Sequence, residues 1–124
     1  MRLKGLNCIV TGGSSGIGAA TVKRFVEEGA HVLIADIDID TANSFAEEMG
    51  SSVEAIKCDV RIESDVKAVS DHAYKTWGKV DVLVNNAGSE LNQTYDKTTL
   101  EEWDRVLDTD LKGPWLMCKY IVPG

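Results

Sequence analysis

Short runs rich in apolar residues alternate along the chain with longer segments in which apolar side chains recur at helical spacing. The apolar runs are residues 8–10, 31–35, 52–58 and 80–84. The amphipathic segments between them are residues 19–28, 41–49 and 64–77. Nearly continuous apolar runs are typical of parallel strands covered on both faces, and the helical segments between them supply the crossovers. The pattern therefore predicts an α/β fold with a parallel sheet and right-handed connections.

A further helical pattern occupies the last part of the sequence. Thr98 precedes Glu101 by the spacing of a capping box, so we expect Thr98 to cap the start of this helix. The apolar positions of the helix are Trp103, Val106, Leu107 and Leu111. Pro114 lies inside the pattern, and because proline lacks the N–H that a helix interior requires, we expect a bend near Asp110 and Leu111.

A glycine-rich turn, Thr-Gly-Gly-Ser-Ser-Gly-Ile-Gly at residues 11–18, joins the first apolar run to the first amphipathic segment. This order brings a strand to the N-terminus of a helix, where unpaired N–H groups and the helix dipole favour an anion such as a pyrophosphate. Gly12 would allow the tight exit from the strand, Gly16 the close approach of a phosphate, and Gly18 the packing of the helix on the sheet. The alternative is an ordinary turn that binds nothing.

The second apolar run ends at an acidic residue, Asp36. In a βαβ unit this end of the second strand lies beside the adenosine ribose, where a carboxylate accepts hydrogen bonds from the hydroxyls. The same charge would repel the 2′-phosphate of NADP. Because Asp38 and Asp40 follow closely, the alternative is an acid that opens a loop or caps a helix.

Two motifs resemble the short-chain dehydrogenase/reductase family. The first is Thr-Gly-x-x-x-Gly-Ile-Gly at residues 11–18, and the second is Asn-Asn-Ala-Gly at residues 85–88, directly after the fourth apolar run. Taken alone, the second motif has a simple turn as its alternative. The resemblance implies a Rossmann-type doubly wound parallel sheet with strand order 3-2-1-4. It also implies that residues 1–124 form an NAD(P)-binding Rossmann domain, the N-terminal portion of a larger domain.

The resemblance further implies which residues bind a nicotinamide dinucleotide. They are Gly12, Ser14, Ser15, Gly16, Ile17, Gly18, Asp36, Asp59, Val60, Asn85, Ala87 and Gly88. Asp59 would accept a hydrogen bond from the adenine amino group and Val60 would pack on the ring; a strand end with a helix-capping aspartate is the alternative for this pair. Members that prefer NADP often carry a basic residue where this chain has the neutral Ser15. Together with Asp36, that position favours NAD over NADP.

The catalytic part of the family pattern is incomplete in this sequence. Family members use a serine and a Tyr-x-x-x-Lys pair, yet none of Tyr74, Tyr95 and Tyr120 is followed by lysine at that spacing. Asp110 stands where the family usually has an active-site asparagine. Aspartate keeps the size but loses the amide donors and gains a charge, so a solvated or capping acid is the alternative to a catalytic role.

The resemblance therefore implies an NAD-dependent oxidoreductase that interconverts a secondary alcohol and a ketone, with this chain as its cofactor-binding half. We expect the full-length form to be a homo-oligomer. The alternatives are a dinucleotide-binding module without catalysis, a truncated fragment, or a relic that binds nothing. Since the fourth strand would be left at an open sheet edge, we expect these 124 residues to aggregate or to be marginally stable.

Composition narrows the class of protein further. A formal net charge of -7 without a basic run disfavours nucleic acid as a partner. No apolar run approaches the roughly 18 to 20 residues of a membrane span, and the N-terminus lacks a signal-peptide pattern, so we expect a cytoplasmic protein. We predict no metal site and no disulfide, with all three cysteines buried as small apolar residues. These are Cys8, Cys58 and Cys118.

Overall fold

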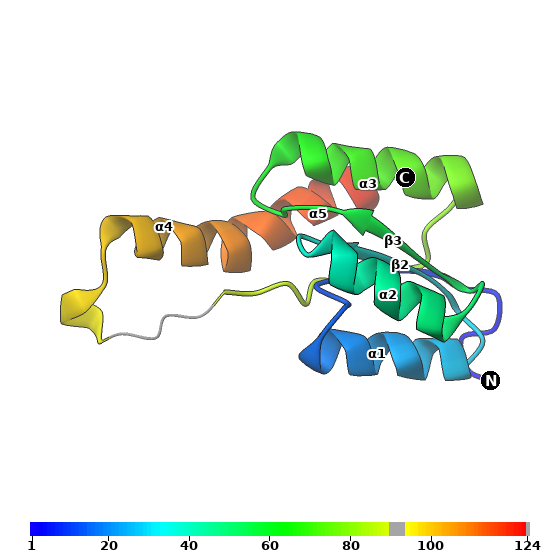
Figure 1. Ribbon diagram of the computed structural model, residues 1–124. Coiled ribbons are helices and arrows are strands. Elements are labelled where there is room, and N and C mark those ends of the chain that lie inside the picture. Colours follow the sequence, from blue (N-terminus) through cyan, green and yellow to red (C-terminus); the bar gives the residue numbers. More distant parts are fainter. Residues whose placement is uncertain (90–93, 124) are drawn as a thin grey trace.

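The computed structural model describes residues 1–89 and 94–123, and Figure 1 shows how their elements are arranged. The strands are β1 (Asn7–Thr11), β2 (His31–Asp36), β3 (Val53–Lys57) and β4 (Val82–Val84). The α-helices are α1 (Gly16–Glu27), α2 (Ile39–Met49), α3 (Glu63–Trp77), α4 (Leu100–Leu107) and α5 (Gly113–Ile121). A 3-10 turn, η1 (Tyr95–Lys97), precedes α4, and a π turn, η2 (Asp108–Lys112), separates α4 from α5.

The strands form one parallel sheet in the order β3-β2-β1-β4, which confirms the predicted Rossmann-type α/β fold. β1 lies between β2 and β4, and all 5 of its residues are buried. β2 lies between β1 and β3 and buries every residue after His31. Burial on both faces explains why these two strands are apolar at nearly every position.

Helices cover both faces of the sheet, with α1 and α2 on one face and α3 and α5 on the other (Figure 1). Successive residues of a strand point to opposite faces, so β1 contributes to two separate cores. Val10 shares one core with Val22 of α1. Ile9 shares the other with Val66 of α3 and Met117 of α5. The sheet is thereby held from both sides, and the carboxyl ends of its strands meet at one edge.

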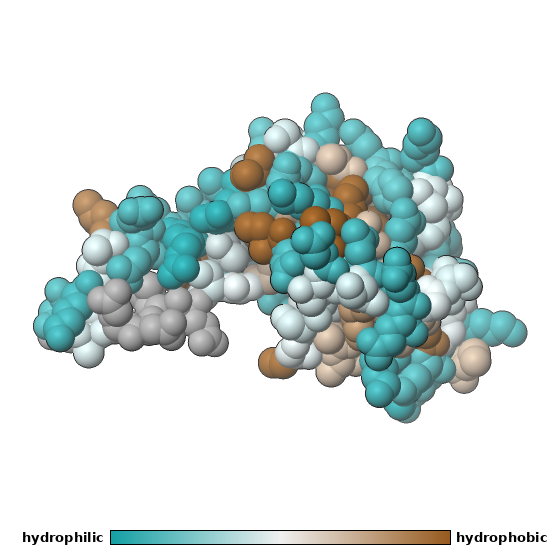
Figure 2. Space-filling view, viewed as in Figure 1, coloured by the Kyte–Doolittle hydropathy of each residue, from teal (hydrophilic) through white to brown (hydrophobic). Residues whose placement is uncertain are grey.

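α4 and η2, which we call the arm, point away from the sheet and from the other helices (Figure 1). No residue of α4 is buried. On the face shown in Figure 2, hydrophobic residues gather where the arm joins the rest of the molecule, and hydrophilic residues cover most of the remainder. The arm is therefore held by less packing than the helices that cover the sheet.

The start of α4 corrects the predicted helix cap by one residue. Thr99, rather than Thr98, caps the helix, and its side chain accepts a hydrogen bond of 3.1 Å from the N–H of Glu102. The hydroxyl of Thr98 instead donates to the carbonyl oxygen of Thr94 across η1. Both threonines stand three residues before a glutamate, so the capping-box spacing alone did not distinguish them.

At the position where a bend was expected from Pro114, the helix changes to a π turn, η2, which contains Asp110 and Leu111. Pro114 itself lies in the first turn of α5, where a missing N–H costs no helix hydrogen bond. The helical pattern read from the sequence is thus two helices joined by a wider turn. None of the helices in residues 1–89 and 94–123 combines the length and the apolar character of a membrane span.

Candidate functional site

A cavity of about 460 Å³ opens at the carboxyl ends of the strands, a size typical of sites for small molecules and cofactors. The ends of β1, β2 and β3, the segment after β4, and the arm all contribute to it. Its lining consists of Gly12, Ser15, Ala35, Asp36, Ile37, Cys58, Asp59, Val60, Arg61, Asn86, Ala87, Gly88, Ser89, Arg105 and Thr109. Seven of the residues predicted from the sequence are among them: Gly12, Ser15, Asp36, Asp59, Val60, Ala87 and Gly88.

The glycine-rich turn adopts backbone conformations that explain two of its glycines. Gly12 has a φ of 63° and Gly16 a φ of 56°, both in the left-handed region that other residues rarely adopt. A Cβ on Gly16 would meet open space, so the protein itself leaves room above this position. A Cβ on Gly12 would lie 3.0 Å from the Cα of Ala87, which brings the segment after β4 directly against the turn.

Gly18 is required by close packing. A Cβ at this position would lie 2.1 Å from the carbonyl oxygen of Gly12 and 2.5 Å from Nδ2 of Asn86. The first turn of α1 thus packs closely on the glycine-rich turn and on Asn86, and this contact leaves no room for a side chain at position 18.

The N-terminus of α1 is open to an anion. Its N-cap residue, Ser15, makes no side-chain capping hydrogen bond, and the first turn carries no acidic residue. Ile17 in that turn is 79% exposed. Unpaired N–H groups and the positive end of the helix dipole are therefore available to phosphate oxygens, which fits the pyrophosphate predicted from the turn.

Asp36 binds the glycine-rich turn to the end of β2. Its Oδ2 accepts hydrogen bonds from the hydroxyl of Ser14 at 2.5 Å and from the N–H of Ser14 at 3.2 Å. Its Oδ1 accepts from the N–H of Asp38 at 2.9 Å, so Asp36 also opens the following loop, as the alternative interpretation had it. The side chain of Ser14 is thereby directed to Asp36, and Asp36 still forms part of the cavity wall.

Thr11 and Asn86 join β1 to the segment after β4, and neither is among the cofactor-binding residues predicted from the sequence. The hydroxyl oxygen of Thr11, which is buried, accepts from the N–H groups of Asn86 and Ala87, each at 3.0 Å. Nδ2 of Asn86 donates to the carbonyl oxygen of Gly12 at 3.1 Å. The signal was present in both motifs: the threonine before the first glycine and the second asparagine of Asn-Asn-Ala-Gly.

The two asparagines of that motif lie differently. Asn86 lines the cavity, whereas Asn85 is exposed and is absent from the lining. The Nδ2 of Asn85 lies 3.8 Å from the Sγ of Cys118 on α5. Cys118 is itself exposed, which corrects the prediction that all three cysteines are buried; Cys8 and Cys58 are buried as expected.

Asp59 and Arg61 form a two-pronged ion pair on the cavity wall. Nη2 of Arg61 lies 2.7 Å from Oδ2 of Asp59, and Nε lies 3.0 Å from Oδ1 and 3.2 Å from Oδ2. Hydrogen bonding by the Arg61 side chain lowers the pKa of Asp59, so the carboxylate is charged at neutral pH. Asp59 is among the residues predicted from the sequence, and Arg61 is not.

Asp110 and Gly113 connect the π turn and the start of α5 to the cavity. Oδ1 of Asp110 accepts a hydrogen bond of 2.8 Å from the N–H of Ser89. A Cβ on Gly113 would lie 2.6 Å from Cγ2 of Val60, so the start of α5 packs directly on a residue of the cavity wall. Asp110 thus holds the segment after β4 by its acceptor oxygen, which aspartate and asparagine share.

Residues 1–89 and 94–123 contain no cluster of histidine, cysteine, aspartate and glutamate side chains suited to a metal ion. His72 instead lies 2.8 Å from Oε1 of Glu54, on the side of the molecule formed by α3 and β3.

A family model described as short chain dehydrogenase matches residues 7–124. Momilactone A synthase from Oryza sativa subsp. japonica is 41% identical over 122 residues, which are 96% of this chain and 44% of that protein. A crystal structure of 3-ketoacyl-(acyl-carrier-protein) reductase from Brucella melitensis, complexed with NADH, has 35% sequence identity to this chain and a TM-score of 0.93. The match covers 98% of this chain and 50% of the reductase. A crystal structure of a short-chain glucose/ribitol dehydrogenase from the same organism has 26% sequence identity and a TM-score of 0.95. That match covers 99% of this chain and 53% of the dehydrogenase. The chain thus spans about half the length of these relatives.

Proposed function

Because this chain belongs to the short-chain dehydrogenase/reductase family of oxidoreductases, we propose that it supplies the NAD-binding half of an enzyme that interconverts a secondary alcohol and a ketone. The observation that carries the proposal is the uncapped N-terminus of α1, which opens beside a cavity walled by Asp36. The reductase from Brucella melitensis, which has the same fold, was crystallised as a complex with NADH. When bound, the nicotinamide would supply the acceptor or donor of a hydride.

Within the cavity, each part of the dinucleotide has a chemically suitable partner. The glycine-rich turn from Gly12 to Gly18 would bind the pyrophosphate through backbone N–H groups, with Ser14 and Ser15 beside it. Asp36 would accept a hydrogen bond from the adenosine ribose through Oδ1, because Oδ1 has one present donor, the N–H of Asp38, whereas Oδ2 already accepts two hydrogen bonds from Ser14. The adenine would lie near Asp59 and Val60, and the nicotinamide half would follow Asn85, Ala87 and Gly88.

Asp36 is also the proposed reason for a preference for NAD over NADP. Asp36 as a residue is 8% exposed and borders the cavity, so a 2′-phosphate beside its carboxylate would meet a fixed negative charge. Two such charges about 4 Å apart repel by roughly 4 kcal/mol at an effective dielectric constant near 20. Ser15, which also lines the cavity, is neutral and offers no positive charge to compensate.

We propose that Asp110 is the residue of this half that contributes to catalysis. Asp110 would act as an active-site residue by orienting the N–H of Ser89, which donates a hydrogen bond to its Oδ1. The π turn η2 places the Asp110 side chain for this contact. No tyrosine of the chain stands in a Tyr-x-x-x-Lys pair, so the proton donor of a complete enzyme would come from elsewhere. We propose further that residues 1–124 are the N-terminal portion of a larger cytoplasmic, homo-oligomeric protein acting on a small alcohol or ketone.

A dinucleotide-binding module without catalysis is the second candidate. The same absence of a Tyr-x-x-x-Lys pair favours it. Binding of NADH without turnover of any alcohol or ketone would support this candidate for the 124-residue chain. If the chain bound neither NADH nor NADPH, that result would contradict both functions and indicate a relic that binds nothing.

The preference for NAD is tested by Asp36→Asn. Asparagine keeps an acceptor for the N–H of Asp38 or for Ser14 but removes the charge, so we expect the ratio of the NADPH to the NADH dissociation constant to fall by about tenfold. Fluorescence of the reduced nicotinamide measures both constants. Asp40→Asn, an exposed acid in the first turn of α2, is the matched control. An unchanged ratio in Asp36→Asn, with an unfolding midpoint equal to the wild type, would contradict the assignment.

A further inference from the structure

Asp110 on η2 brings a carboxylate to the segment after β4. Its Oδ1 accepts a hydrogen bond of 2.8 Å from the N–H of Ser89. A Cβ on Gly88 would lie 3.5 Å from the same oxygen, so no side chain separates the carboxylate from Gly88. Gly88 and Ser89 both line the cavity, and so does Thr109, the residue before Asp110. The carboxylate therefore lies at the edge of the cavity, beside the segment that we propose for the nicotinamide half.

The other charged residues of the cavity lining are Asp36, Asp59, Arg61 and Arg105. Asp36 ends β2, and Asp59 and Arg61 form an ion pair after β3, so these three charges belong to the proposed adenosine end. Arg105 belongs to the arm, as Asp110 does. Asp110 differs from Arg105 because a backbone hydrogen bond fixes its carboxylate to a residue of the lining.

We propose that Asp110 makes the site distinguish the oxidised from the reduced dinucleotide. This inference rests on the proposed function and adds a role for the charge that aspartate brings in place of the family's asparagine. The nicotinamide ring carries one positive charge in NAD+ and none in NADH. A carboxylate at the edge of the cavity attracts the charged ring and has little effect on the neutral one. Asp110 thus strengthens the binding of NAD+ relative to that of NADH.

A purely structural role for Asp110 gives a different result. If the side chain only holds Ser89 through an acceptor oxygen, asparagine performs the same task, because its amide oxygen accepts from the same N–H. Asp110→Asn would then leave the binding of both nucleotides unchanged, or weaken both equally if Ser89 moved. Only an effect of charge acts on one redox state of the nicotinamide and not on the other.

The test compares three nucleotides by isothermal titration calorimetry: NAD+, NADH and ADP-ribose, which lacks the nicotinamide. For Asp110→Asn we expect the ratio of the NAD+ to the NADH dissociation constant to rise about fivefold over the wild type. The effect is moderate because Asp110 is exposed and water screens its charge. ADP-ribose should bind equally to both chains. The charge of Arg105 is the same in both chains and cancels from the comparison.

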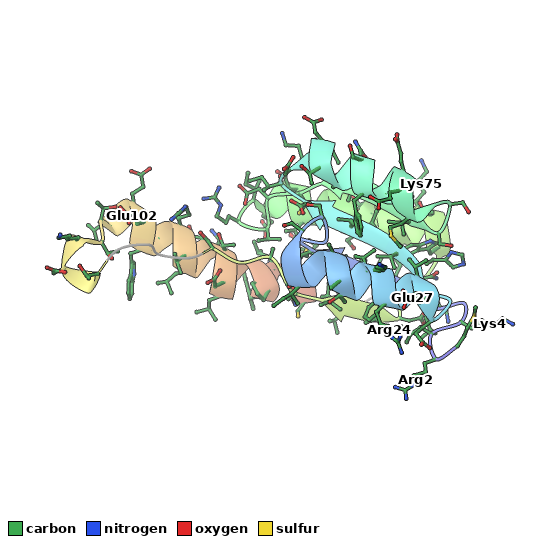
Figure 3. All side chains as sticks on the ribbon, turned by 60° about the horizontal axis from the view of Figure 1, so that its bottom comes forward. Arg2, Lys4, Arg24, Glu27, Lys75 and Glu102 are labelled. Atoms are coloured by element: carbon green, nitrogen blue, oxygen red, sulfur yellow. The ribbon has the colours of Figure 1, made fainter. Side chains whose placement is uncertain are left out.

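Asp104→Asn is the matched control, because it removes an equal charge from the same arm at an exposed residue outside the cavity lining. Figure 3 shows Glu102, two residues earlier, on the part of the arm that extends away from the sheet. The ratio of the two dissociation constants for Asp104→Asn should equal that of the wild type.

A second variant adds charge instead of removing it. Thr109→Asp places a further carboxylate in the cavity lining and leaves Asp110 beside Ser89, so it should lower the same ratio. An unchanged ratio in Asp110→Asn or Thr109→Asp would overturn the inference and leave the proposed function standing, as would an equal shift in Asp104→Asn. If the wild type bound neither NAD+ nor NADH, the proposed function and this inference would fail together.

Discussion

At the scale of single residues, the glycine-rich turn shows that neighbouring glycines are needed for different physical reasons. Gly16 has a φ of 56° and open space where a Cβ would stand, so only its backbone conformation restricts the residue type. Gly18 has no positive φ, but a Cβ there would overlap the carbonyl oxygen of Gly12 and the amide of Asn86. The first restriction is local, and the second depends on a residue of the segment after β4.

This difference predicts unequal costs for two alanine substitutions. Gly18→Ala should lower the free energy of unfolding by about 3 kcal/mol, because the neighbouring atoms are backbone and a short amide that have to shift. Gly16→Ala, the control, should cost only about 1 kcal/mol, the penalty of a left-handed backbone with a side chain. Urea unfolding followed by tryptophan fluorescence measures both. Equal costs would show that the packing at Gly18 relaxes freely.

At the scale of elements, the short strand β4 is held to β1 at both of its ends. At the carboxyl end, Thr11 and Asn86 link the two strands. At the other end, Oδ2 of Asp81 accepts a hydrogen bond of 2.8 Å from the N–H of Asn7. Lys79 lies 3.1 Å from Oδ1 of the same aspartate. β4 consists of only 3 residues, so these side-chain contacts supplement a short ladder of backbone hydrogen bonds.

The contact at Asp81 predicts a pH dependence. The hydrogen bond from Asn7, followed by the contact with Lys79, lowers the pKa of Asp81 below its ordinary value of 3.8. A group whose pKa is lower in the folded state stabilises the fold fully above the unfolded value, and the contribution disappears as the pH falls through the folded pKa. Wild type should therefore melt at a higher temperature than Asp81→Asn near pH 6, and the difference should shrink steadily below about pH 4.

Thermal melts of both chains, followed by circular dichroism between about pH 6 and pH 2.5, measure that difference. Comparison of the pair cancels the titration of the other carboxylates, which both chains share. Asp40→Asn serves as a control, since no strand end depends on its side chain, and it should melt like the wild type throughout. A difference for Asp81→Asn that stays constant with pH would contradict the assigned role.

At the scale of the whole molecule, the sheet has β4 at one edge, paired only with β1 among the described residues. The arm adds an exposed apolar surface. The apolar side chains of this surface recur at helical spacing and form one stripe along the arm. They are Leu100, which is 82% exposed, Trp103 (54%), Leu107 (39%) and Leu111 (69%). Unpaired strand edges and contiguous apolar surface both promote association.

We therefore expect the 124-residue chain to self-associate in solution at micromolar concentration. Leu111→Glu should reduce the association, because it places a charge in the apolar stripe of the arm. Val122→Glu makes the same kind of change at a residue that is 70% exposed but lies outside the arm, and it should have little effect. Light scattering coupled to size-exclusion chromatography measures the mass of each. A sharp, reversible melt from a monomeric wild type would contradict the expectation.

Much of the fold followed from the sequence because its determinants are local. The alternation of apolar runs and amphipathic segments located the four strands and the helices α1, α2 and α3, but it did not separate α4 from α5. Gly12, Gly16 and Asp36 stand at the turn and strand end that the motifs indicated. The cap of α4 was misplaced by one residue because Thr98 and Thr99 satisfy the same spacing. The exposure of Cys118 was missed because a single side chain in an amphipathic helix carries no sign of which neighbour covers it.

By itself, the sequence determined the alternation of strands and helices and the glycine-rich turn, because hydrophobic periodicity and backbone freedom act within a few residues. The order of the strands was implied by the resemblance of two motifs to a family. Only the tertiary structure decided which polar side chains meet. Asn86 bonds to Gly12 across 74 residues, and Ser14 turns to Asp36. Arg61, unmarked in the sequence, occupies the carboxylate of Asp59. Hydrogen bonds depend on the positions of two atoms in space, and those positions exist only once the sheet has brought its strand ends together.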